Sequence, residues 1–110
     1  MIIKNPDKLL KEFIPTPDGD IWYVTDLSVK MDEDGTTYTY KMDTQVPVKS
    51  SPNQQYYSMT RAKNCEVKLK LFGDTYEIFC EGETQRGYCT DIDTLDKFIH
   101  ILIYLLPNTY

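Results

Sequence analysis

Two tight-turn signals constrain the fold of this chain more strongly than any other feature of its sequence. Asp34-Gly35 and Gly73-Asp74 each separate two runs in which apolar and polar residues alternate, a pattern typical of a β-hairpin. With Gly73-Asp74 as the turn, one face of the second hairpin pairs apolar residues: Leu71 with Tyr76, Leu69 with Ile78 and Val67 with Cys80. Its other face pairs Lys70 with Glu77 and Lys68 with Phe79. A one-residue slip would mix the two faces, so the pattern fixes the register.

The first hairpin, with Asp34-Gly35 as its turn, separates two faces in the same way. Its mostly apolar face pairs Met31 with Tyr38, Val29 with Tyr40, Leu27 with Met42, Thr25 with Thr44 and Tyr23 with Val46. The opposite face then holds Trp22 and Val24, and it sets Asp26 directly across from Asp43. The stretch GYCT at 87–90 predicts a short fifth strand.

Helices are expected around the two hairpins. Residues 5–15 begin with Asn5 as a cap and Pro6 at the first helical position, and they end at a second proline. Residues 51–63 open on Ser-Pro with a capping-box spacing, which is compatible with a helix or an open loop. Residues 94–106 are apolar around most of a helical circumference, which is typical of a helix packed on a core. This segment is shorter than the ~20 apolar residues that a membrane span needs.

These elements predict a single domain over 1–110. Its fold class is α+β: a two-layer sandwich in which an antiparallel sheet of two hairpins, with four to five strands, carries helices on one face. Cys65, Cys80 and Cys89 form an odd set without metal-binding or redox spacing, which favours free thiols in a reducing compartment. The N-terminal sequence lacks the pattern of a signal peptide, so we expect a cytoplasmic protein.

Charge is unevenly distributed along the chain. The net charge is −5, and residues 12–34 hold seven acidic residues and one lysine. Residues 61–70 hold four basic residues and one glutamate. An acidic chain is repelled by nucleic acid and by anionic membranes, so both are excluded as direct partners. The charge instead favours a basic protein as the partner.

The face of the sheet that the helices leave uncovered is the predicted partner-binding surface. Its predicted residues are Trp22, Val24, Asp26, Asp43, Phe79, Asp32, Glu33 and Asp34. Like charges across a strand pair are destabilising, and a cationic partner residue would relieve the repulsion between Asp26 and Asp43. Trp22 would serve as an aromatic anchor. The alternative is that Trp22 and Phe79 pack under a loop while both aspartates point into water.

The sequence holds no signature of catalysis, of a metal site or of a cofactor. Cys89 and His100 would form a nucleophilic dyad if the fold brought them together, but their spacing does not require this. The acidic stretches MDEDGT and PDGD lack the full spacing of a calcium loop and are typical of turns. We therefore expect no catalytic residues, no bound metal and no cofactor.

A small acidic chain without a catalytic motif is expected to act by binding. The expected function is stoichiometric inhibition of a basic nucleic-acid-acting enzyme, with acidic residues 18–34 facing the cationic site of the enzyme. Immunity proteins against nuclease toxins act in this way, as do phage-encoded inhibitors of bacterial defence nucleases such as anti-CRISPR proteins. Either a monomer or a homodimer is compatible with this function.

Two other functions remain open from the sequence. The expected order of helix, hairpin, helix, hairpin and helix resembles type III secretion chaperones in topology, without a shared motif. That resemblance implies a homodimer that holds an unfolded effector segment. The nine tyrosines instead allow a small enzyme or a small-molecule-binding protein with a Tyr-lined pocket.

Overall fold

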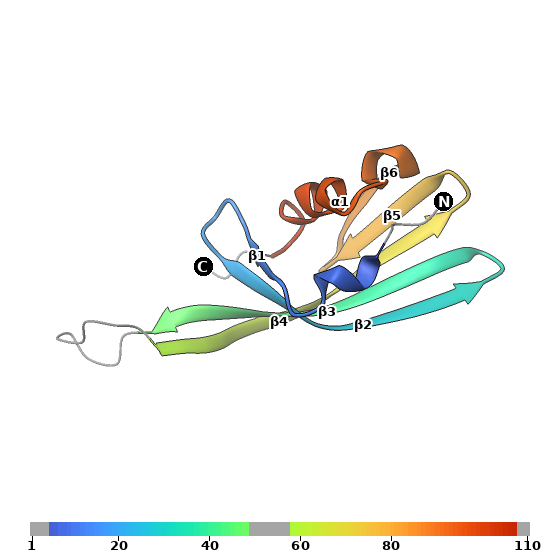
Figure 1. Cartoon of the computed structure of the whole chain (residues 1–110). Coiled ribbons are helices and arrows are strands. Elements are labelled where there is room, and N and C mark those ends of the chain that lie inside the picture. Colours follow the sequence, from blue (N-terminus) through green and yellow to red (C-terminus); the bar gives the residue numbers. More distant parts are fainter. Residues whose placement is uncertain (1–4, 49–57, 108–110) are drawn as a thin grey trace.

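The fold is a curled antiparallel sheet with one α-helix on its concave face (Figure 1). The computed structural model describes residues 5–48 and 58–107, and it describes side chains within 5–44 and 64–107. In these residues the sheet has six strands that follow one another in chain order. They are β1 (Phe13–Pro15), β2 (Ile21–Asp32), β3 (Gly35–Val48), β4 (Ser58–Phe72), β5 (Thr75–Cys80) and β6 (Glu83–Tyr88).

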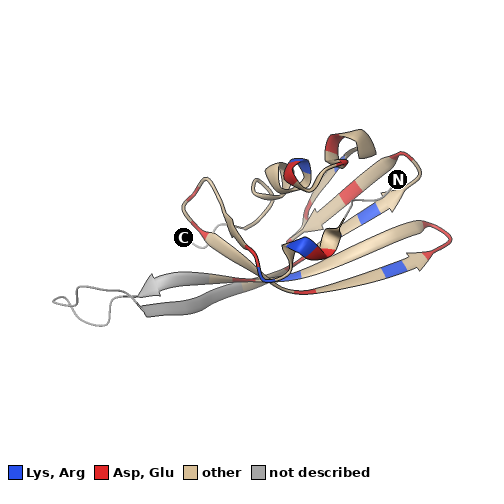
Figure 2. Cartoon of the chain, viewed as in Figure 1, with Lys and Arg blue, Asp and Glu red and all other residues tan. Residues whose placement is uncertain are grey.

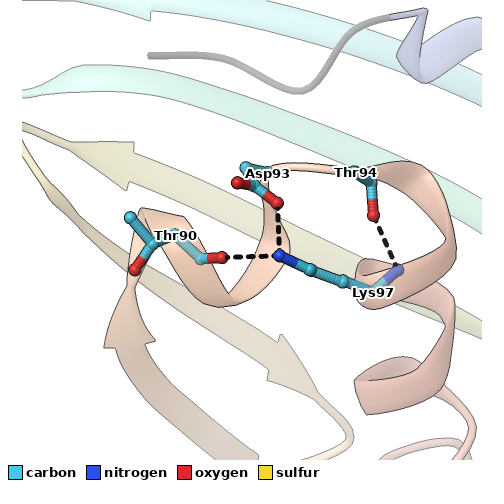
Figure 3. A network of polar contacts seen from close by, with 4 residues as sticks. All are labelled: Thr90, Asp93, Thr94 and Lys97. Atoms are coloured by element: carbon cyan, nitrogen blue, oxygen red, sulfur yellow. Dashed lines mark hydrogen bonds and ion pairs between the residues drawn. The ribbon is translucent and has the colours of Figure 1, made fainter.

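In the described ranges three helical segments accompany the sheet: the 3₁₀ turns η1 (Pro6–Leu9) and η2 (Cys89–Ile92), and the helix α1 (Leu95–Leu102). Thr94 caps α1, because its hydroxyl accepts the Lys97 backbone N–H at 3.3 Å. The Lys97 ammonium reaches back to the Thr90 carbonyl at 3.3 Å and to the Asp93 carboxylate at 2.8 Å (Figure 3). These contacts hold η2 and the first turn of α1 together.

The hydrophobic core lies between the concave face of the sheet and the helical segments. The Tyr40 and Phe98 rings are 5.8 Å apart, and the Tyr40 hydroxyl donates to the Pro6 carbonyl at 3.0 Å. The helix α1 and the turn η1 therefore cover the same face of the sheet, as expected. Burial raises the pKa of Tyr40 well above its ordinary value, so its hydroxyl remains a proton donor.

The predicted α+β class is confirmed in its general form, but the strand count and the helix layout differ. The sheet has six described strands in place of four to five. The helix expected over residues 5–15 is reduced to η1, because Lys11 and Glu12 exchange backbone hydrogen bonds with Val24 and the chain then enters β1. Residues 58–63, expected in a helix or loop, belong to β4, and 49–57 lie outside the described residues.

The second hairpin has the predicted register throughout, including Lys70 opposite Glu77 and Lys68 opposite Phe79. The fifth predicted strand exists but is displaced: β6 covers Glu83–Tyr88, and the chain turns into η2 at Cys89. The C-terminal segment packs on the core as expected, although α1 ends at Leu102 and continues as turns to the buried Leu106. Within the described residues, no helix has both the length and the apolar character needed to cross a bilayer.

The predicted register of the first hairpin is wrong along its whole length: Met31 lies opposite Thr36 and Val29 opposite Tyr38, and none of the predicted pairs forms. Two differences account for this. The two-residue turn is Glu33-Asp34, closed by Asp32 opposite Gly35, and the Asp32 carboxylate accepts the Asp34 N–H at 2.8 Å. A β-bulge at Thr25 then adds one residue to β2, between the pair Val24–Met42 and the pair Asp26–Lys41. Side chains of a strand alternate between the two faces of the sheet. The extra residue therefore moves every β2 residue before the bulge to the face opposite to the predicted one.

Candidate functional site

The bulge removes two residues from the predicted partner-binding surface. Trp22 and Val24 are fully buried on the core face, so the prediction that they face a partner is wrong. Asp26 lies opposite Lys41, and Asp43 lies opposite Tyr23, so the predicted pair of opposed aspartates does not exist. No like-charge repulsion at this position therefore calls for a cationic partner.

The remaining predicted residues lie on the convex, uncovered side of the sheet or at its end. Phe79 is exposed on β5, as predicted. Asp32, Glu33 and Asp34 are exposed in the β2–β3 turn (Figure 2). Asp18 and Asp20 belong to the β1–β2 connection at the other end of β2, and Asp20 is buried. Twelve residues of strand separate the two ends, roughly 36 Å at ~3 Å per residue, so residues 18–34 do not form one acidic surface.

A surface pocket of about 700 Å³ lies on the convex face next to the β2–β3 turn. It is lined by Asp34, Lys70, Phe72, Thr75, Tyr76, Glu77, Arg86, Gly87 and Tyr88. Two of the lining residues are large aromatic residues with solvent-exposed side chains: Phe72 is 58% exposed and Tyr88 is 67% exposed. Exposed aromatic residues beside a concavity are typical of a binding site for another molecule.

The strand register explains how the two rings are held. Phe72 lies opposite Thr75, and Thr75 lies opposite Tyr88, so the three residues form one row across β4, β5 and β6. The backbones of Phe72 and Tyr88 are therefore two strand spacings apart, about 9.5 Å, with the small Thr75 on the strand between them. We call this row the aromatic slot. Its width suits one planar group or one extended side chain between the rings.

A row of charged residues runs beside the aromatic slot. In the register of the sheet, Glu77 stands between Lys70 on β4 and Arg86 on β6. The Arg86 Nε donates to the Glu77 carboxylate at 2.6 Å, which fixes the carboxylate next to the slot. Because Arg86 is largely exposed, we expect this ion pair to contribute little to stability.

Acidic residues surround the open end of the slot. Asp34 lines the pocket from the β2–β3 turn, and Asp32 and Glu33 precede it in the chain at the same turn. Asp74 lies in the neighbouring β4–β5 turn, which the register brings next to Gly35 through the pairing of β3 with β4. All four carboxylates are exposed, and we call them the acidic rim. The aromatic slot and the acidic rim together form the candidate site.

Cys89 and His100 do not share a site. The Cys89 thiol is buried and donates to the Thr75 carbonyl oxygen at 3.4 Å. The Cys89 backbone N–H donates to the Asp74 backbone carbonyl oxygen at 2.7 Å. His100 is exposed on α1 and packs edge-on against Tyr104. Burial raises the pKa of the Cys89 thiol, which disfavours the thiolate that a nucleophile needs. Cys89 therefore holds the β4–β5 turn in place.

We expect the Cys89 thiol to react slowly with a maleimide at pH 7.5 in the folded protein. Both its burial and its raised pKa lower the concentration of accessible thiolate. The check is to label folded and urea-unfolded protein and to quantify each cysteine by peptide mass spectrometry. Equal labelling of Cys89 in both states would contradict its buried position.

Sequence reasoning missed Phe72, Tyr88 and Arg86, although it paired Lys70 with Glu77. The signal was available, because a turn at Gly73-Asp74 makes Phe72 and Thr75 the closing pair on the same face as Phe79. Tyr88 was missed because the fifth strand was predicted at 87–90 without a pairing register, whereas β6 covers Glu83–Tyr88 and sets Tyr88 opposite Thr75. In the ranges where side chains are described, no group of three or more His, Cys, Asp or Glu residues is arranged to hold a metal ion.

Comparisons of the chain with protein-family models, with curated proteins and with solved structures give no match. What this surface does is therefore inferred from its geometry and chemistry.

Proposed function

We propose that this chain is a non-enzymatic binding protein that inhibits a basic nucleic-acid-acting enzyme by occupying its cationic surface. The observation that carries the proposal is the aromatic slot framed by the acidic rim. Exposed aromatic residues supply most of the binding energy in many protein interfaces, and a surrounding charge of one sign selects and steers a partner of the opposite sign.

The slot suits an arginine or lysine side chain of the partner. A guanidinium group between the Phe72 and Tyr88 rings would gain cation–π contacts from both. Its charge would lie beside the Asp34 carboxylate at the rim of the pocket. Lys70 and Arg86 border the slot on the side away from Asp34. Because they repel a cationic side chain, the arginine or lysine of the partner would enter from the side of the acidic rim.

An enzyme that binds nucleic acid offers the largest basic surface among common partner classes, because its groove must neutralise phosphates. The net charge of −5 steers the chain toward such a groove and away from the nucleic acid itself. Occupation of the groove blocks the substrate without any chemistry by this chain. Immunity proteins and phage-encoded nuclease inhibitors are the classes that share this mechanism.

The test begins with capture of a partner on immobilised protein, followed by titration of the activity of that enzyme. We expect complete inhibition at a one-to-one ratio. Phe72→Ala and Tyr88→Ala should each weaken binding by about tenfold or more, because each removes an aromatic contact at the centre of the site. Tyr104→Ala is the matched control, since Tyr104 is 69% exposed but lies after α1, outside the slot.

Two results would overturn the proposal. The first is a captured partner that is acidic or does not act on nucleic acid. The second is binding that survives the double variant Phe72→Ala/Tyr88→Ala while Tyr104→Ala weakens it. A thermal midpoint measured for each variant shows whether the fold is retained.

A further inference from the structure

Among the residues that the structure describes, one side of β2 carries no neighbouring strand over most of its length. In the described part of the chain, β1 pairs with β2 only from Ile21 to Tyr23, and Lys11 and Glu12 bond the backbone of Val24. From Thr25 to Asp32 no strand of the described ranges 5–48 and 58–107 pairs with the outer side of β2, so this side is a free edge of the described sheet (Figure 1). A free edge presents unpaired N–H and C=O groups that can pair with another strand.

The alternation of hydrogen bonds identifies which backbone groups point outward. Asp32 and Gly35 close the two-residue turn as a bonded pair, so even-numbered residues of β2 bond to β3 as far as Asp26. Leu27, Val29 and Met31 therefore turn their N–H and C=O groups to the free side. The Leu27 N–H is consistent with this, because it donates to the carboxylate of its neighbour Asp26 at 2.9 Å.

The same three residues leave apolar side chains in the open. Val29 is 51% exposed and Met31 is 76% exposed, while Leu27 is half-buried. An edge strand is normally protected by charged side chains or by a covering element. This edge carries Asp26 and Lys30 on its convex face, but on its other face the outward backbone groups accompany an apolar row, which is the composition of a strand that pairs.

We propose that this edge pairs antiparallel with the same edge of a second copy of the chain, about a two-fold axis at Ser28. In this register Leu27 lies opposite Val29 of the second copy. The two-fold axis also places Val29 opposite Leu27 of the second copy, so this pair occurs twice. Asp26 faces Lys30 of the second copy, also twice, on the convex side. The two six-stranded sheets then join into one continuous sheet.

Charge complementarity selects the second copy as the occupant and also selects the register. Asp26 and Lys30 lie two residues before and two residues after Ser28. Pairing with a second copy about Ser28 therefore sets each of them opposite a residue of the other charge. The register centred on Val29 would set Asp26 against Asp32, which is repulsive. Pairing also gives the Leu27 N–H a carbonyl partner, which releases the Asp26 carboxylate for the lysine.

The other sheet edge does not share these features. The strand β6 alternates Glu83, Gln85 and Gly87 with Thr84, Arg86 and Tyr88, so neither of its faces carries an apolar row. The dimer edge lies on β2, whereas the aromatic slot lies on β4, β5 and β6. Dimerisation therefore leaves the slot rings open, and the two surfaces can be tested separately. A single strand pair is smaller than a standard interface, so we expect a micromolar dissociation constant.

The test uses charge reversal with rescue by mixing, followed by sedimentation equilibrium from 1 to 500 μM. We expect Asp26→Lys to weaken dimerisation by about tenfold or more, because two lysines then oppose each other at both pairs. Lys30→Asp should weaken it similarly, because two aspartates then oppose each other. An equimolar mixture of the two variants should form a heterodimer, because every pair again joins opposite charges.

Controls separate the dimer from the fold and from the proposed function. Phe72→Ala/Tyr88→Ala should dimerise like the wild type, and Lys30→Asp should keep its thermal midpoint because Lys30 lies opposite Thr37 within its own chain. Asp26→Lys also places a lysine opposite Lys41 of the same chain, so a small loss of thermal midpoint is expected for this variant and does not count against the dimer. A wild-type chain that is monomeric at 500 μM would overturn the proposal. So would a dimer that both reversals leave intact, or a mixture in which no heterodimer forms.

Discussion

Replacing Trp22 by alanine is expected to lower the thermal midpoint of the protein by about 10 °C or more. Trp22 is fully buried, between Ile14 of β1 and Thr44 of β3 in the register of the sheet. Truncating a buried aromatic residue to alanine costs about 3–5 kcal/mol of unfolding free energy, through lost burial and the cavity that remains. For a chain of 110 residues, a loss of that size shifts the midpoint by ten degrees or more.

The control is Trp22→Phe, which keeps most of the apolar ring. In the described structure the indole Nε1 of Trp22 is buried without a hydrogen-bond partner, so the phenylalanine variant also removes a desolvated donor. We therefore expect Trp22→Phe to cost less than half as much as Trp22→Ala in calorimetry. A midpoint within 2 °C of the wild type for Trp22→Ala would show that Trp22 faces solvent and that the bulge at Thr25 is wrongly placed.

Replacing Gly35 by alanine is expected to destabilise the protein by about 3 kcal/mol or more. Gly35 follows the β2–β3 turn with φ of 131°, a conformation that residues with a side chain rarely adopt. A Cβ atom at this position would also collide with the Leu71 backbone carbonyl oxygen of the neighbouring strand. The collision cannot be relieved by rotating a side chain, so β3 and β4 would have to separate.

Gly73→Ala is the matched control for this prediction. Gly73 also has a positive φ, of 60°, but a Cβ atom there would meet no other atom within 4 Å. The control therefore isolates the backbone strain, which costs about 1 kcal/mol. Urea denaturation of the two variants should show the larger loss for Gly35→Ala. Equal losses would mean that β3 and β4 are farther apart at this turn than the structure shows.

The sequence predicted the second hairpin fully because one signal fixed both its turn and its faces. Gly73 supplies the positive φ of the turn, and the apolar residues alternate without interruption in each strand, at odd positions from Val67 to Leu71 and at even positions from Tyr76 to Cys80. No irregularity interrupts either strand between those residues. Local turn chemistry and side-chain alternation therefore agree, and nothing distant overrides them.

The first hairpin was predicted less well because its irregularity was read as a feature of the surface. Within β2, the buried Trp22 and Val24 are even-numbered, whereas the later apolar residues are odd-numbered: Leu27, Val29 and Met31. This change of parity marks the bulge at Thr25, since one extra residue restores all of them to the same face. Without the bulge, the apolar pair falls on the wrong face and resembles a binding surface.

The N-terminal segment could not be predicted from local signals. Asn5 and Pro6 favour a helix start, but the helix stops at Leu9. The backbone of Lys11 and Glu12 bonds to Val24, a partner that only the folded sheet provides. For the candidate site, the sequence located the acidic turn, whereas the aromatic slot depends on three strands coming into register.

The simple order of the strands has a consequence for how the chain folds. Every ladder of the sheet joins strands that are consecutive in the sequence, so each can form by closing a short connection. Strand pairing can therefore proceed in the order of synthesis, one hairpin after another. Phe98 and Leu102, which cover the concave face, belong to a helix made after all six strands. A nascent chain thus passes through a stage in which the strands are paired but α1 does not yet cover the apolar concave face. This face can aggregate with other chains until α1 packs against it.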